Sequence, residues 1–137
     1  MTHHSLPHTA DIRIAFDTPT FGALLQEGVV VMRQLLAGDA VVEPRESRSL
    51  AVPGHEPAEL FFGFLRELLF QAATEGFLPA TFEPHESGAP GIRGTLAGEA
   101  FDPGRHEPQP EVKAITRHGF VVERRGDGWY AEVVFDV

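Results

Sequence analysis

The segment PAELFFGFLRELLFQAATEG, from Pro57 to Gly76, constrains the fold more than any other part of this sequence. Proline suits the first turn of a helix and glycine its end, so these two residues bound a predicted helix. Its apolar residues recur at helical spacing and cover a wide face: Leu60, Phe61, Phe64, Leu65, Leu68, Leu69 and Ala72. A helix with so wide an apolar face is buried over much of its circumference.

The rest of the chain predicts one more helix and a series of strands. A helix is predicted over 20–37, with Thr18 or Thr20 as its N-cap and Gly38 just after its end. The predicted strands are 11–16, 47–52, 77–83, 92–101, 111–116, 119–124 and 129–137, with a polar loop over 102–111 and a glycine-rich hairpin turn at 126–128. This order predicts a single α+β domain over residues 1–137, with two helices packed on a mainly antiparallel sheet.

The charge of the chain limits the classes of molecule that it is expected to bind. With 11 basic and 20 acidic residues, the net charge is -9, which repels a nucleic-acid backbone and argues against unaided RNA or DNA binding. There are no cysteines, which excludes disulfides and thiolate metal sites. We find no signal peptide and no apolar run long enough to span a bilayer, and therefore expect a cytoplasmic protein without a membrane partner.

Two aspartates stand out at the ends of predicted strands. Asp11 opens the first strand, on its polar face, although strands disfavour aspartate. Asp136 lies on the polar face of the last strand, next to the C-terminal carboxylate of Val137. If the first and last strands are neighbours, these three carboxylates converge and repel one another unless a hard cation such as Ca²⁺, Mg²⁺ or Mn²⁺ binds. The alternative is that both aspartates are solvated strand-end residues.

Other polar residues have both functional and structural interpretations. Lys113 in EVKAIT is either a surface lysine at a sheet edge or a fixed cation for a phosphate or a carboxylate. His8, His106 and His118 have no zinc-site spacing, and we interpret them as hydrogen-bonded structural histidines. The chain has no nucleophile elbow, P-loop or dinucleotide-binding glycine motif, so the sequence shows no catalytic nucleophile with an obvious base.

The motifs together resemble the archease family over essentially the whole chain. They are HTADIRI near the N-terminus, TEGFLPATFE after the second helix, EVKAITRHGF, and the closing WYAEVVFDV. The glycine- and proline-rich loop and the glycines at positions 22 and 28 depart from the expected pattern without touching these motifs.

The resemblance implies a function and a site. Archease assists a GTP-dependent, RtcB-type RNA ligase in tRNA splicing and RNA repair, promoting its guanylylation and repeated turnover. The protein would then contact RNA only through the ligase, which also binds the GTP. The resemblance assigns Asp11, Asp136 and Val137 to a metal site, with Ca²⁺ as the associated ion, and Lys113 to ligase activation. His8 and His118 are candidates for a supporting role.

Two alternative functions stay open at this point. One is a chaperone-like modulator of a tRNA methyltransferase, which an older proposal for similar proteins suggests. The other is a metal-dependent phosphohydrolase that uses the two aspartates and Lys113 as a carboxylate–lysine site.

Overall fold

The structure is a computed structural model that describes residues 11–137. Within these residues, two helices and six strands follow one another. They are β1 (Asp11–Thr18), α1 (Phe21–Ala37), β2 (Glu46–Pro53), α2 (Pro57–Glu75), β3 (Phe77–Gly88), β4 (Gly91–Ala100), β5 (Ala114–Arg125) and β6 (Gly128–Asp136). None of the described helices is long and apolar enough to cross a membrane.

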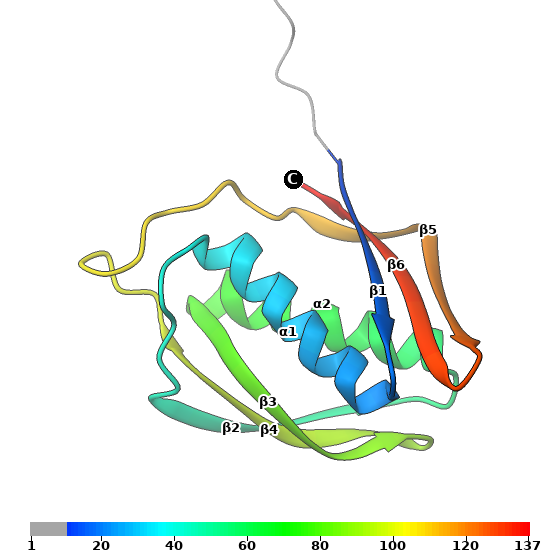
Figure 1. Ribbon diagram of the computed structural model, residues 1–137. Coiled ribbons are helices and arrows are strands. Elements are labelled where there is room, and N and C mark those ends of the chain that lie inside the picture. The colour runs from blue at the N-terminus through cyan, green and yellow to red at the C-terminus, as the bar shows by residue number, and fades with distance from the viewer. Residues whose placement is uncertain (1–10) are drawn as a thin grey trace, which may run out of the picture.

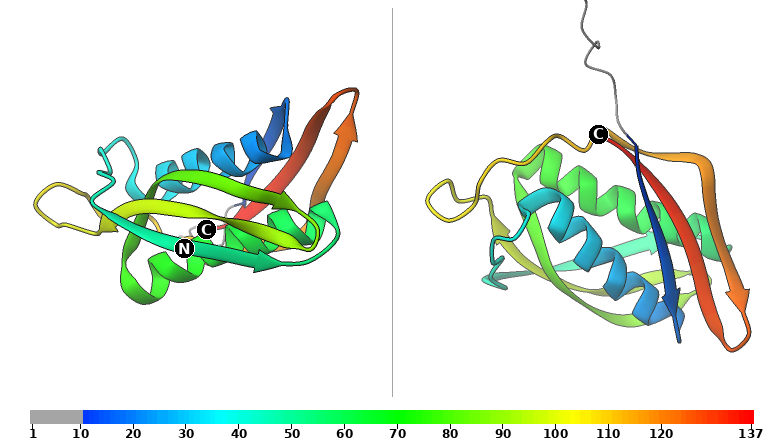
Figure 2. Two further views of the ribbon diagram at one scale, coloured as in Figure 1. Left: turned by 90° about the horizontal axis from the view of Figure 1, so that it is seen from below. Right: turned by 45° about the horizontal axis from the view of Figure 1, so that its top comes forward.

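The strands form two antiparallel sheets of three strands each (Figure 1). The first sheet has the order β1-β6-β5, and the second has the order β2-β4-β3. The α+β class and the antiparallel pairing are therefore confirmed, and the strands divide between two sheets. The first strand of the chain lies beside the last, which brings its start to the C-terminus (Figures 1 and 2).

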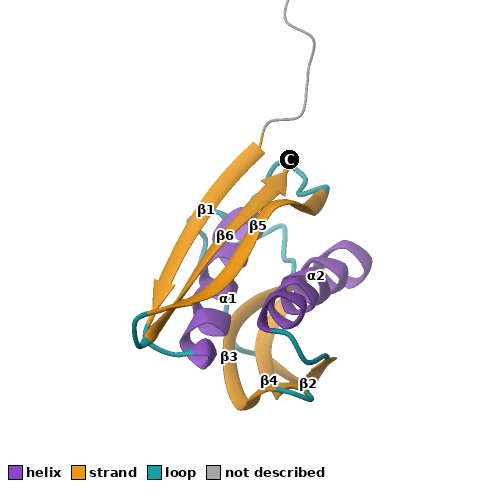
Figure 3. Cartoon of the chain, turned by 90° about the vertical axis from the view of Figure 1, so that its right-hand side faces the viewer, coloured by secondary structure: helices purple, strands orange, loops and turns teal. Residues whose placement is uncertain are grey.

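Both helices pack between the sheets (Figure 3), and this explains the apolar circumference of α2. The left view of Figure 2 shows the second sheet in front of the helices. One hydrophobic core joins all these elements, with Phe61 and Phe64 of α2 fully buried at its centre. The predicted bounds of both helices are confirmed to within one residue, as is the glycine that follows each helix. Of the two N-cap candidates the structure has Thr20, whose side chain accepts a hydrogen bond from the Ala23 N–H.

The two helices approach closely at Gly28, one of the glycines that weaken the pattern of α1. A Cβ atom at this position would lie 3.1 Å from Leu65 Cδ2 and 3.1 Å from Phe61 Cε1, both on α2. Gly28 is therefore a contact residue between the helices, and its absent side chain sets how closely they pack.

We expect Gly28→Val to lower the free energy of unfolding by about 1–3 kcal/mol, because the added methyl groups overpack this contact. Denaturant unfolding followed by circular dichroism measures the change. Gly22→Ala is the matched control, since a Cβ there meets Pro84 Cγ at an ordinary 3.5 Å, and its effect should stay within about 1 kcal/mol. Equal stabilities of Gly28→Val and the wild type would contradict this account of the helix contact.

The predicted strands 111–116 and 119–124 need correction. They are parts of one strand, β5, which starts only at Ala114 and changes register against β6 between Thr116 and Val121. Pro110 has no N–H to donate to a ladder, which favours a late start of the strand. Lys113 thus lies just before β5, at the end of the long loop that follows β4.

Candidate functional site

The candidate site lies where β1 begins and β6 ends. Asp11 is directly opposite Asp136 in the antiparallel ladder, and the register continues without a shift to Thr18 and Trp129. Directly opposed residues of an antiparallel pair share one face of the sheet, with their Cβ atoms about 4.5–5.5 Å apart. The neighbouring first and last strands are therefore confirmed, and they bring the two carboxylates together.

The alternation of β6 determines which way Asp136 faces. Ala131, Val133 and Phe135 are fully buried against the helices, so Asp136, one residue further on, belongs to the opposite face of the sheet. Val137 is partly buried and packs against the core. The end of the chain is thus held in the fold rather than frayed.

Asp136 has an unusual environment for a strand-end carboxylate. Its Oδ1 atom is buried and has no hydrogen-bond partner among residues 11–137. A buried carboxylate oxygen without a partner is costly, and a second carboxylate opposite it adds repulsion. A cation that binds both aspartates would relieve both penalties, so the residues present fit a metal ion at this position.

The donor set also limits the kind of ion. No group of three His, Cys, Asp or Glu side chains in the described part of the chain gathers closely enough to hold a metal. The side-chain donors are the oxygens of Asp11 and Asp136, to which Val137 adds the terminal carboxylate. All-oxygen donors suit Ca²⁺ or Mg²⁺, and Ca²⁺ takes about six to eight of them, so backbone carbonyls, water or a partner would supply the rest.

Lys113 is tied to the same place through the backbone. Its N–H donates a 2.7 Å hydrogen bond to the carbonyl oxygen of Asp136, and the next residue, Ala114, pairs with Asp136 in the ladder. Lys113 is exposed, and it is the one lysine of the chain. An exposed lysine whose backbone is fixed to that of Asp136 fits a role in binding a phosphate or a partner's carboxylate.

Of the two histidines that were candidates for a supporting role, the structure describes only His118. His8 lies outside the described residues. His118 follows the Thr116–Val134 pair, further along the sheet than the Asp11–Asp136 pair. It is exposed, and its backbone N–H, not its imidazole, donates to Thr116 Oγ1. The structure therefore does not bring His118 together with the carboxylates.

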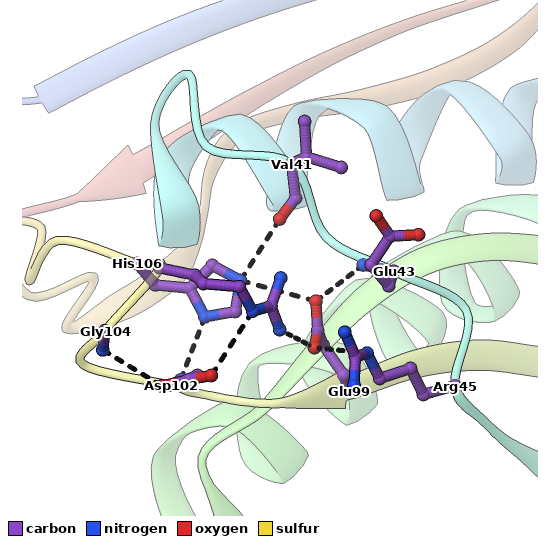
Figure 4. Close-up of polar contacts among 8 residues, drawn as sticks. Val41, Glu43, Arg45, Glu99, Asp102, Gly104 and His106 are labelled. Carbon is purple, nitrogen blue, oxygen red and sulfur yellow. Dashed lines mark hydrogen bonds and ion pairs between the residues drawn. The ribbon is translucent and has the colours of Figure 1, made fainter.

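Sequence reasoning missed a second polar cluster, around the buried carboxylate of Glu99 at the end of β4 (Figure 4). Glu99 is only 5% exposed. It accepts a 2.6 Å hydrogen bond from the Glu43 N–H and a short one from Arg105, and it pairs with Arg45 at 3.4 Å. Burial alone raises the pKa of Glu99, but the Glu43 N–H and the Arg105 guanidinium outweigh it and hold this pKa below its usual value.

His106 completes this cluster, and its interpretation as a structural histidine is confirmed. It is 1% exposed. Its Nδ1 accepts the Asp102 N–H at 2.9 Å, and its Nε2 lies 3.1 Å from the Val41 carbonyl and 3.4 Å from Glu99 Oε2. The cluster therefore ties the loop that leads to Lys113 to the segment after α1. No local sequence pattern predicts this cluster, because its members are distant in sequence.

Comparisons with known proteins agree with this architecture. Residues 3–137 match the model of the archease protein family (MTH1598/TM1083). Protein archease of Methanopyrus kandleri is 35% identical over 142 residues, covering 100% of both chains. Protein archease of Pyrococcus furiosus is 34% identical, covering 95% of this chain and 94% of the relative.

Two solved structures have the same fold. The crystal structure of an archease from Thermotoga maritima, described as a possible chaperone, superimposes with a TM-score of 0.73 at 23% identity, covering 100% of this chain and 98% of that one. The solution structure of protein 1598 from Methanobacterium thermoautotrophicum gives a TM-score of 0.76 at 26% identity, covering 96% of each chain.

Proposed function

Because the chain belongs to the archease family, we propose that it is a non-catalytic protein cofactor of a GTP-dependent, RtcB-type RNA ligase. In this role it promotes guanylylation of the ligase and lets the ligase turn over repeatedly in tRNA splicing and RNA repair. RNA and GTP are bound by the ligase rather than by this chain. The observation that carries the proposal is the Asp11–Asp136 pair, in which a buried oxygen of Asp136 has no hydrogen-bond partner among residues 11–137.

The site residues have separate parts in this proposal. Asp11, Asp136 and the carboxylate of Val137 hold a divalent metal ion, with Ca²⁺ as the expected ion. A bound Ca²⁺ supplies positive charge for phosphate oxygens without redox chemistry. Lys113, fixed through its backbone to Asp136, offers a second positive charge toward the phosphates of the ligase-bound GTP or toward a carboxylate of the ligase.

The charge of the chain supports a protein partner rather than direct contact with RNA. A net charge of -9 repels the phosphate backbone and favours association with the basic surface of an RNA-binding enzyme. The experiment that tests the proposal is guanylylation of the cognate ligase with GTP, with and without this protein. Phosphate release by the protein alone would favour the phosphohydrolase. Capture of a tRNA methyltransferase without a ligase would favour the chaperone-like modulator.

We expect Lys113→Gln to reduce stimulation of guanylylation by at least about tenfold, because a charge-assisted contact is worth about 1.5–3 kcal/mol. Calcium affinity should change little, since the carboxylates remain. Arg93→Gln is the matched control: Arg93 is exposed on β4, in the other sheet, and should leave stimulation unchanged. Full stimulation by Lys113→Gln would remove the lysine from the mechanism.

A further inference from the structure

One backbone edge of β1 pairs with no other strand in the described part of the chain. The strand lies at the outside of the first sheet, paired with β6 on one side only (Figure 3). Half of the N–H and C=O groups of an edge strand point away from the sheet, where they are available to another chain. β1 runs for eight residues and pairs in unbroken register, so its edge is long and regular.

The other edge strands of the two sheets carry features that blunt pairing. β3 has two prolines and two shifts in register, and β5 has a shift after Thr116. β2 ends in Pro53. Prolines and bulges are devices with which proteins protect edges from pairing with other chains. Among the described strands, β1 is the one edge strand with neither device.

A groove of about 420 Å³ runs beside this edge, between β1 and α1. Its apolar lining includes Ile14 and Phe16 of β1 and Val31 of α1. Its charged lining residues are Asp17 and Glu27, both exposed. Neither belongs to an ion pair among residues 11–137. The groove is thus lined by apolar residues and by two acidic ones, and it contains no basic lining residue from the described part of the chain.

We propose that the edge of β1 and this groove form the docking site for an extended, basic segment of a partner protein. The segment adds to β1 as a fourth strand of the first sheet, places an apolar side chain in the groove, and pairs a lysine or arginine with Asp17 and Glu27. That the partner is the RNA ligase rests on the proposed function.

The position of the edge supports this partner. β1 begins at Asp11, so a segment paired along it leads directly to the Asp11–Asp136 pair. A docked ligase would then be held beside the candidate metal site by backbone hydrogen bonds. Two other occupants are disfavoured by charge: RNA is repelled by the carboxylates, and a second copy would bring acidic grooves together in chains that each carry a charge of -9.

The test measures how tightly the cognate RtcB-type ligase binds a variant of this protein in which the charges of the groove are reversed. The double variant Asp17→Lys/Glu27→Lys should raise the dissociation constant by at least about tenfold, because it places like charges opposite a basic segment. Asp39→Lys/Glu83→Lys makes the same change of net charge at exposed positions outside the groove, and should weaken binding by less than about threefold. Hydrogen exchange of the β1 amides should slow when the ligase binds to the wild type.

Each outcome has a distinct meaning. If the double variant and its control bind equally, or if the β1 amides exchange unchanged in the complex, the docking site is wrong while guanylylation shows whether the proposed function stands. If the wild type neither binds nor stimulates the ligase, the proposed function fails and the ligase is not the occupant. A dimer of the wild type that the double variant disperses, or RNA binding that depends on Asp17, would assign the groove to another occupant and overturn the inference.

Discussion

Asp136→Asn is expected to abolish most calcium binding and most stimulation of the ligase, while the fold survives. Calcium affinity depends on the number of charged ligands, so loss of this carboxylate should raise the dissociation constant by about 100-fold. The substitution removes repulsion with Asp11 and keeps the shape of the side chain, so the metal-free variant should be as stable as the wild type. Isothermal titration calorimetry with Ca²⁺ and a guanylylation assay measure the two losses.

A thermal readout separates metal binding from activity. Calcium at about 100 times its dissociation constant should stabilise the wild type by about 2.7 kcal/mol, because it binds only the folded state. At the same calcium concentration Asp136→Asn should keep only about 0.4 kcal/mol of this gain, because its dissociation constant is about 100-fold higher. Asp11→Asn should likewise lose most of it. Asp127→Asn is the control, since Asp127 is exposed in the turn before β6, at the far end of the sheet. If Asp136→Asn bound Ca²⁺ as tightly as this control, no metal site would exist at the pair.

Much of the candidate site could be predicted from the sequence, because residues of a strand alternate between the two faces of the sheet. Alternation in the first and last strands placed Asp11 and Asp136 on polar faces, and one further condition, that these strands are neighbours, brought them together. Which strands are neighbours is a question of sheet topology, and the periodicity of the sequence does not answer it. The β1–β6 ladder meets this condition. The metal and the roles of Val137 and Lys113 stay predictions, supported by the family resemblance and by the buried Asp136 Oδ1, which has no hydrogen-bond partner in the part of the chain that the structure describes.

Other features could not be predicted, for physical reasons. The division into two sheets follows from the burial of α2 on both sides, and a helical pattern shows how wide an apolar face is without saying what covers it. The bulge that joins two predicted strands into β5 has no fixed sequence signature. Glu99 looks like an ordinary strand residue, since its partners Glu43 and Arg105 come from loops that meet only in the folded chain.

Glu99→Gln should lower the free energy of unfolding at pH 7 by about 2–4 kcal/mol, because it removes the buried acceptor charge from a hydrogen-bonded cluster. The ordinary pKa of this carboxyl is 4.5, and the fold lowers it. A lowered pKa means that the unfolded chain takes up a proton first as the pH falls. The stabilisation is therefore complete above about pH 5 and is lost as the pH falls through 4.5 toward the pKa of the folded state.

The difference in stability between the wild type and Glu99→Gln should therefore shrink as the solution is acidified. Denaturant unfolding at a series of pH values from about 7 to 3 measures it, and the shared titration of other carboxylates cancels in the difference. Glu83→Gln, an exposed carboxyl on the neighbouring β3, is the control and should differ from the wild type by no more than about 0.5 kcal/mol at any pH. A difference that stayed constant with pH would show that Glu99 acts through shape rather than charge, because only an ionised carboxylate gains from Arg105 and the Glu43 N–H in this way.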